Sequence, residues 1–232
     1  MIVAIHQPQY MAWSGYFHKI ARADLFVVLD DVQFKKNEWQ HRNRIRTSQG
    51  WQWLSVPNRY RFPQKINEVA VNNEIDWRAK HRHSLEAAYG KAPFFDEYWR
   101  DFESFYSESW NDLASLNIAS VKLLCRFLGI ATAIETSSCH GFDGTSTERL
   151  VNICRYFKAD MYLSGSGGTE YLDENMFSRA GVRVGYQEFV PPRYPQHWAR
   201  NDEEFVPGLS AADLLFNCGT KSLSVLMGKA QS

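Results

Sequence analysis

The chain has 232 residues, a length that suits one large domain or two small ones. Hydrophobic residues make up 44% of it and aromatic residues 15%, which excludes intrinsic disorder. Lys and Arg together number 26, as do Asp and Glu, so no net field would hold the protein on duplex nucleic acid or on an anionic membrane, and any affinity for polyanions has to be local.

The N-terminus lacks the basic segment and the long apolar stretch of a signal peptide, and no run approaches the roughly 18 apolar residues of a membrane span. We therefore expect a cytoplasmic protein that does not insert into membranes. The cysteines have no CxxC spacing, which favours buried free thiols over a disulfide or a zinc site. They are Cys125, Cys139, Cys154 and Cys218.

The N-terminal stretch has the pattern of a βαβ unit. Residues 2–5 and 25–29 are continuously apolar, as expected for strands of a parallel sheet that is covered on both faces. Residues 16–23 between them have helical spacing. Residues 43–56 then alternate about a turn signal at 48–50, which predicts a hairpin with an aromatic and basic face.

The middle of the chain is predicted to be mainly helical. A short strand at 66–71 leads into three helical stretches, one at 76–89, one after Pro93 and one at 111–128. Gly129 is expected to end the last of them. This block is either a subdomain inserted into the sheet or the outer layer of one domain.

The α/β rhythm returns after the helical block. Predicted strands lie at 131–136, 161–163 and 182–189, and predicted helices at 149–157, 171–179, 211–217 and 221–227. Thr145 and Glu148 have the spacing of a capping box, and Ser210 is expected to cap the first of the last two helices. The pattern predicts an α/β fold, a mostly parallel Rossmann-like sheet with flanking helices, in one domain of residues 1–232 with 76–128 as a candidate helical insertion.

The first stretch with candidate chemistry joins the first predicted strand to the first helix. In an open α/β sheet, ligands bind outside the carboxyl ends of the strands, where a helix N-terminus offers free N–H groups to a phosphate. His6 is a candidate acid, base or phosphate contact because its charge changes near pH 7; the alternative is a capped histidine in a tight loop. The other candidate binding residues here are Gln7, Tyr10, Trp13, Gly15 and Tyr16.

Asp30 and Asp31 end the second predicted strand and form the second candidate. Adjacent carboxylates can hold Mg²⁺, or one of them can act as a base. The basic residues that follow could neutralise a diphosphate while Trp39 stacks on a base, although a solvated hairpin face fits the same charge run. The candidate binding residues are Gln33, Lys36, Trp39, Arg42, Asn43 and Arg44.

A glycine-rich loop, residues 164–168, follows the strand predicted at 161–163. Successive small residues let backbone N–H groups approach an anion closely. The loop matches neither the dinucleotide fingerprint nor the Walker loop, and a tight strand-to-helix turn is the alternative. Because it should emerge from the same sheet edge as His6, contact with a phosphate or oxyanion is favoured. The candidate residues are Ser164, Gly165, Ser166 and Gly167.

Motifs along nearly the whole chain carry a family resemblance. They are His6-Gln7-Pro8-Gln9-Tyr10, Gly15-Tyr16-Phe17, Leu29-Asp30-Asp31-Val32-Gln33-Phe34, Arg42-Asn43, Tyr162-Leu163-Ser164-Gly165, Tyr171-Leu172-Asp173 and Asp213-Leu214-Leu215-Phe216-Asn217. Together they resemble the WbqC-like family. The resemblance implies a bacterial protein of surface polysaccharide synthesis, chiefly of the O-antigen of lipopolysaccharide, that transfers glycine or another aminoacyl group to an amino sugar.

We therefore predict an enzyme, a transferase that forms an amide between an amino acid and the amine of a nucleotide-linked amino sugar. Amide formation from a free carboxylate in water is uphill, so the second partner has to be an activated donor: an adenylate, a thioester or an aminoacyl-tRNA. ATP and Mg²⁺ are candidate cofactors, with the metal requirement left open. The alternatives are a nucleotidyltransferase-like enzyme and a noncatalytic module that binds a nucleotide sugar.

In this scheme His6 and the loop through Gly15 hold nucleotide phosphates, and Asp30 or Asp31 binds metal or deprotonates the sugar ammonium. The basic residues of the hairpin meet the diphosphate, and residues 164–168 stabilise developing negative charge. Aromatic residues of the first quarter of the chain are interleaved with basic ones and are expected to line the nucleotide-sugar cleft. They are Tyr10, Trp13, Tyr16, Trp39, Trp51 and Trp53.

Overall fold

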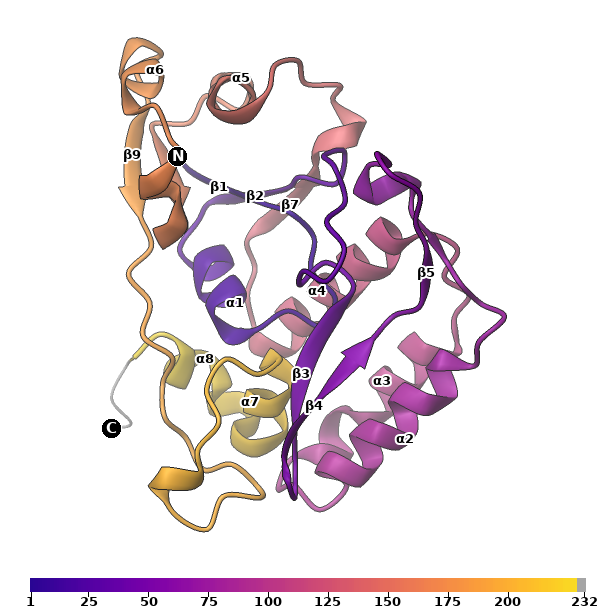
Figure 1. Ribbon diagram of the computed structural model, residues 1–232. Helices are drawn as coiled ribbons and strands as arrows, with labels where there is room; N and C mark the ends of the chain where they lie inside the picture. The colour runs from indigo at the N-terminus through magenta and orange to yellow at the C-terminus, as the bar shows by residue number, and fades with distance from the viewer. Residues whose placement is uncertain (229–232) are drawn as a thin grey trace.

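A five-stranded parallel sheet forms the centre of the protein (Figure 1). The computed structural model describes residues 1–228. The strand order is β7-β2-β1-β8-β9, and every neighbouring pair is parallel. The strands are β1 (Ile2–His6), β2 (Leu25–Val28), β7 (Ala133–Thr136), β8 (Met161–Ser164) and β9 (Arg183–Tyr186). The predicted α/β fold with a mostly parallel Rossmann-like sheet is confirmed.

Helices cover both faces of this sheet. Side chains alternate along a strand, so Ala4 of β1 joins a core cluster with α1 (Ser14–Ala21), whereas Val3 joins a second cluster on the opposite face. That second cluster includes residues of α5 (Ser146–Tyr156) and α6 (Glu174–Arg179). Burial on both faces is the reason that the central strands are continuously apolar in sequence.

The helical block predicted in the middle of the chain is present. It consists of α2 (Trp77–Tyr89), α3 (Phe95–Ser107) and α4 (Leu113–Leu128). Gly129 ends α4 at a φ of +70°, a left-handed conformation that glycine adopts without steric strain. Residues of all three helices belong to the core cluster that contains Ala4 of β1, so the block packs against the sheet.

The predicted hairpin is formed by β3 (Arg42–Thr47) and β4 (Gly50–Ser55), which pair antiparallel. One of its faces points inward, because Asn43, Ile45 and Leu54 are buried. The other face carries the arginine and tryptophan side chains that alternate with them. The hairpin packs on the core by its inner face, and on its outer face Arg44 and Arg46 donate to backbone carbonyls of residues 204–208.

The strand predicted at 66–71 is present only at its end. Residues Ile66–Glu68 form a 3₁₀ turn, in which the Glu68 carboxylate accepts a hydrogen bond from the backbone N–H of Lys65. This local bond favours a tight turn over an extended backbone. Only β6 (Ala70–Val71) is extended, and it pairs with β5 (Asn58–Arg59).

The predicted capping box at the start of α5 is wrong. Thr145 occupies the N-cap position, but its side chain makes no capping hydrogen bond. Ser146 next to it has a φ of +49°, which turns the chain out of the geometry that the box with Glu148 needs. By contrast, the Ser210 hydroxyl accepts from the N–H of Ala212 and caps α7 (Ala211–Cys218) as predicted, and α8 (Ser222–Leu226) follows.

Helix α6 starts at Glu174, later than the predicted residue 171. The preceding residues Ser166–Glu170 form a 3₁₀ helix, and the Asp173 carboxylate accepts from the N–H of Asn175 at the N-terminus of α6. Strand β9 is likewise shorter than predicted. The later start of α6 follows from this 3₁₀ helix, which takes up the chain after the glycine-rich loop.

Three of the cysteines are buried free thiols, as predicted. They are Cys125, Cys154 and Cys218. Cys139 is free but exposed, since it lies in the short 3₁₀ turn Ser137–Cys139 after β7, and the prediction of its burial is wrong. No helix among residues 1–228 is long and apolar enough to cross a membrane.

The loop between β1 and α1 is buried, although loops usually run over the surface because buried backbone groups need partners. Residues 8–12 are all buried, and side chains from other elements supply those partners. The Asn43 amide donates to the Tyr10 carbonyl, the Asn117 amide donates to the Pro8 carbonyl, and the Ser120 hydroxyl accepts from the N–H of residue 11. The hairpin and α4 thus hold this loop in place.

Tyr10 lies inside this packing and is fully buried. Its hydroxyl is 2.9 Å from Nδ1 of His81 and 2.7 Å from the hydroxyl of Tyr106. The ring therefore cannot lie along a ligand cleft, contrary to the expectation from its place in the sequence. Tyr10 belongs to a buried hydrogen-bonded network that joins the loop to α2 and α3.

We predict that Tyr10→Phe lowers the free energy of unfolding by about 1–3 kcal/mol, because it removes a partner from two buried polar groups, those of His81 and Tyr106. Urea denaturation measures the change. Tyr156→Phe is the control, since the Tyr156 side chain is exposed. A Tyr10→Phe protein with unchanged stability and weaker ligand binding would contradict the structural role and restore the binding one.

Candidate functional site

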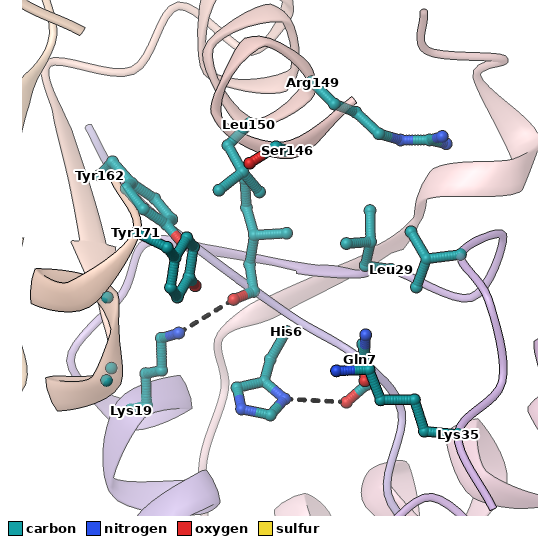
Figure 2. Close-up of a pocket in the computed structure, with 15 residues that line it drawn as sticks. His6, Gln7, Lys19, Leu29, Lys35, Ser146, Arg149, Leu150, Tyr162 and Tyr171 are labelled. Carbon is teal, nitrogen blue, oxygen red and sulfur yellow. Dashed lines mark hydrogen bonds between the residues drawn. The ribbon is translucent and has the colours of Figure 1, made fainter. Parts of the chain in front are cut away.

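A cavity of about 480 Å³ opens where β1 and β8 end (Figure 2). The chain passes from β1 to β2 and β7 on one side of the sheet, and places β8 and β9 on the other side. The strand order therefore reverses between β1 and β8, and the crevice at such a reversal is where open α/β sheets bind ligands. The volume lies within the usual range of about 300–1,000 Å³ for small-molecule sites.

The lining of this cavity is rich in cations. Lys19, Lys35 and Arg149 contribute to it, and none of its lining residues within the described part of the chain is Asp or Glu. Figure 2 shows Lys19 and His6 on one side of the cavity and the α5 residues Ser146 and Arg149 on the other. The other lining residues are Ile5, Gln7, Leu29, Val32, Leu150, Tyr162, Gly165, Gly167, Gly168 and Tyr171. Such a lining suits an anionic ligand.

Lys19 is the most unusual group of the cavity. Its side chain comes from α1 and is almost fully buried, with 3% exposed, and Nζ donates to the Ile5 carbonyl at 2.9 Å. No carboxylate within residues 1–228 forms an ion pair with it. Burial without a counter-charge lowers the pKa of Lys19 to about 7, because desolvation disfavours the ammonium form.

His6 ends β1 beside this lysine. Burial, together with the charge of Lys19, lowers the pKa of His6 to about 4, so the imidazole is neutral at pH 7. Its Nδ1 lies 3.0 Å from the Gln7 carbonyl, and because a carbonyl can only accept, Nδ1 carries the proton. The His6 imidazole therefore carries no positive charge with which to bind a phosphate at pH 7. The acceptor Nε2 remains for a donor group of a ligand.

The glycine-rich loop lies on the same cavity, as its expected place at the sheet edge suggested. Gly165 and Gly167 line the cavity, and Gly168 packs against Ser164 so closely that a Cβ at 168 would overlap the Ser164 hydroxyl oxygen. That hydroxyl is buried and has no hydrogen-bond partner within residues 1–228. The glycine-rich loop thus forms a tight turn and also part of the cavity wall. Its backbone can come close to a ligand in the cavity.

Asp30 lies beside the cavity rather than in it. Its carboxylate accepts from the Ser138 hydroxyl at 2.6 Å, from the Ser138 N–H at 3.0 Å and from the Ser137 hydroxyl at 3.2 Å. Asp31 forms a part-buried ion pair with Arg149. No group of three or more His, Cys, Asp or Glu within residues 1–228 could hold a metal ion, and these two carboxylates are already engaged by Ser137, Ser138 and Arg149.

The structure can now be compared with known proteins. A model of the WbqC-like protein family matches residues 7–225. The chain belongs to the WbqC-like protein family. It is also 38% identical over 224 residues to "Uncharacterized protein Rv1507c" of Mycobacterium tuberculosis (strain ATCC 25618 / H37Rv), covering 95% of each chain. No solved structure matches the chain.

Only some of the predicted site residues of this WbqC-like protein meet at the cavity. His6, Gln7, Gly165 and Gly167 line it, and Asp31 reaches it through its ion pair with Arg149. The others lie elsewhere. Tyr10 and Tyr16 are buried, and Asn43 supports the buried loop. Trp13 covers Gly15 at the start of α1, and the outer face of the hairpin carries Trp39, Arg42 and Arg44. Three further residues are exposed: Gln33, Lys36 and Ser166.

The sequence reading missed several lining residues, of which Lys19 had a visible signal. Lys19 lies three residues after Tyr16 and one before Ile20, so helical spacing places a charged side chain on the apolar face of α1. Lys35 lines the cavity, whereas the predicted binding residue next to it, Lys36, does not. Arg149 had no local signal, because its contribution depends on how α5 packs over the sheet.

We predict that Gly168→Ala destabilises this WbqC-like protein by about 1–3 kcal/mol, because the added Cβ would overlap the Ser164 hydroxyl. Urea denaturation measures the loss. Gly167→Ala is the matched control, since nothing lies within 4 Å of a Cβ there. Combining Gly168→Ala with Ser164→Ala should recover part of the loss. Equal effects of Gly168→Ala and Gly167→Ala would refute the packing explanation.

We predict that Lys19→Met stabilises the protein more at about pH 6 than at about pH 9. The pKa of Lys19 is about 7 in the folded protein against 10.5 ordinarily, so the unfolded chain binds more protons between these values. Stability of the natural protein then rises with pH through this window, and the advantage of methionine shrinks. Unfolding free energies at both pH values test this, with exposed Lys122→Met as control. A difference independent of pH would refute it.

Proposed function

We propose that this protein is a transferase that binds a nucleotide-linked amino sugar in the cavity and joins an amino acid, glycine or a similar one, to its amine in the synthesis of surface polysaccharide such as O-antigen. The observation that carries the proposal is Lys19, a buried amine with no carboxylate partner within residues 1–228, in a cationic cavity at the strand-order reversal. A buried titratable group in such a cleft is a physical marker of a functional site.

The phosphates of the sugar nucleotide fit the outer part of the lining. Lys35 offers an exposed ammonium group. After β8, Gly165 and Gly167 have no side chains, so a phosphate can come close to their backbone. Arg149 adds a guanidinium whose charge is partly balanced by Asp31. This set replaces the basic hairpin residues of the sequence-based scheme as the diphosphate site.

The amine needs to lose a proton before it can attack. A sugar ammonium has no lone pair, and a neutral lysine whose pKa is about 7 can accept its proton near physiological pH. The amine nitrogen then attacks the activated carboxyl carbon, the C–N bond forms, and the bond from that carbon to the leaving group breaks. Lys19 takes the role that the sequence suggested for Asp30, whose carboxylate is already held by Ser137 and Ser138.

ATP and Mg²⁺ remain part of the proposal only for activation of the amino acid. The cationic lining suits the phosphates of ATP as it suits those of a sugar nucleotide. A magnesium ion would have to be carried largely by the phosphates themselves, in keeping with the habit of Mg²⁺ to bind through few carboxylates. A thioester or an aminoacyl-tRNA would make both unnecessary.

The test incubates purified protein with a nucleotide-linked amino sugar and each donor class in turn: ATP with glycine, a glycyl thioester and a glycyl-tRNA. Mass spectrometry should detect a sugar that has gained one glycyl group with one of them. Pyrophosphate release without amino acid would point instead to nucleotidyl transfer. No change of the sugar with any donor, together with bound sugar nucleotide, would leave a noncatalytic binding module.

We predict that Lys19→Met lowers the transfer rate by about 10²–10⁴-fold, the usual contribution of a general base.

The adjacent pair Lys35→Met and Lys36→Met tests phosphate binding, because Lys35 lines the cavity and Lys36 does not. Only Lys35→Met should raise the KM for the sugar nucleotide. Equal effects of both variants would refute the assignment of the cavity as the phosphate site.

A further inference from the structure

The outer face of the hairpin carries tryptophan and arginine side chains that the proposed function does not use. In β4, Trp51 and Trp53 are two residues apart and therefore point to the same side of the strand. Arg44 of β3 lies directly across from Trp53, and Arg42 lies two residues before it on the same side. With Trp39 from the preceding turn, these five residues form what we call the Trp–Arg face.

The rings and guanidinium groups of the Trp–Arg face interleave. The Arg42 guanidinium carbon lies 4.3 Å from the ring centre of Trp53, and that of Arg44 lies 5.1 Å from Trp51 and 5.6 Å from Trp39. The Trp53 ring centre is 5.5 Å from those of Trp39 and Trp51. Planar groups thus follow one another at short intervals along the face.

Two of the tryptophans of the Trp–Arg face are exposed to solvent, unlike tryptophans of the core. Trp51 is 44% exposed and Trp53 is 37% exposed, and they are the two exposed tryptophans within residues 1–228. Isolated exposed apolar side chains need no explanation, but a contiguous set of large rings marks an interaction surface. The arrangement therefore points to a ligand that offers flat faces of its own.

The charge of the Trp–Arg face is not balanced locally. Within residues 1–228 neither Arg42 nor Arg44 forms an ion pair with a carboxylate. Their protein partners are backbone carbonyls, that of Asn37 for Arg42 and those of Pro207 and Gly208 for Arg44. In a chain of zero net charge, the hairpin thus carries two guanidinium groups that no carboxylate within residues 1–228 pairs with.

We propose that the Trp–Arg face binds single-stranded nucleic acid. Bases stack on indole rings and on guanidinium planes with little regard to sequence, and arginine side chains pair with the phosphates between them. In duplex nucleic acid the base faces are stacked on one another, so they cannot stack on the tryptophan rings. A neutral glycan could stack on the rings but would leave the arginines without an anionic partner.

The Trp–Arg face is separate from the cavity, since none of its residues lines that cavity. The inference therefore does not rest on the proposed transfer reaction. Its test measures nucleic-acid binding alone, with no donor or sugar present, so a failed transfer assay would leave it standing and a failed binding assay would leave the cavity proposal standing.

The experiment follows the fluorescence anisotropy of a labelled single-stranded RNA of about ten nucleotides, a length within the usual site sizes of such proteins. Trp53→Ala should weaken binding by about 5- to 150-fold, the loss expected from one stacked base. Trp53→Phe should weaken it less, because a ring remains. Tyr156→Ala is the matched control, an exposed aromatic side chain of α5 outside the face.

Salt and charge provide a second measurement. With phosphates on both arginines, a fourfold rise in salt should lower affinity by about sevenfold, and Arg42→Gln should reduce this dependence by about half. Arg42→Lys should keep the salt dependence but lose affinity, because a lysine does not stack as a plane. Folding of each variant is checked by circular dichroism.

Three outcomes would overturn the proposal. One is that no RNA binding is measurable at micromolar protein. Another is that duplex RNA of the same length binds as tightly as the single strand. The third is that an anionic oligosaccharide competes as well as an unlabelled single strand, which would make the face a glycan site. Binding that is lost in Trp53→Ala, kept in Tyr156→Ala and specific to single strands supports the proposal.

Discussion

The buried loop between β1 and α1 is the constraint on which the arrangement of this protein depends. Residues 8–12 are inside the molecule, and a buried carbonyl or N–H without a partner costs about 1–3 kcal/mol. The hairpin supplies Asn43, and α4 supplies Asn117 and Ser120, as partners for that backbone. Asn117 also donates to the Gln40 carbonyl, and the Gln40 side chain donates to Gln7 at the mouth of the cavity. The helical block and the hairpin are thus needed to fix the end of β1, where the cavity begins.

The electrostatics of the cavity, like its position at the strand-order reversal, support a ligand-binding site. A lysine buried without a carboxylate is unfavourable for stability below its own pKa, since desolvation of the ammonium is not offset by a counter-charge. Exchanging Lys19 for an apolar residue would remove that cost, so folding alone does not explain its presence. The neutral imidazole of His6 beside it avoids a second buried charge. One titratable amine near neutrality and a lining without Asp or Glu among the described residues are the features on which the proposed base rests.

The sequence predicted the architecture well because architecture follows from periodicity. Continuous apolar runs identified β1 and β2, and helical spacing identified α2 to α4, since both patterns are direct consequences of burial. Site residues were harder to predict because residue type does not reveal a partner. Asn43 and Tyr10 carry the functional groups of binding residues, yet each is engaged by another part of the fold. Arg42 and Trp39 are close to the cavity in sequence but belong to the outer face of the hairpin. Lys19 is the opposite case. The sequence alone places it on an apolar helix face, but only the three-dimensional structure shows that no carboxylate within residues 1–228 pairs with it.

The cavity and the Trp–Arg face are joined by a short piece of chain. Lys35 lines the cavity and Trp39 belongs to the face, and four residues of chain span at most about 14 Å. Amide formation needs an activated carboxyl group, and an aminoacyl ester on the terminal ribose of a single-stranded RNA is such a group. In its aminolysis the C–N bond forms, the ester C–O bond breaks, and the proton taken from the amine returns to the ribose oxygen, so neither ATP nor a metal is consumed at this step. A strand bound on the hairpin as proposed would lie beside the part of the cavity that Lys35 lines, whereas an adenylate or a thioester donor makes no use of the Trp–Arg face. Under the two proposals taken together, an aminoacyl ester of RNA is the donor class that uses both sites.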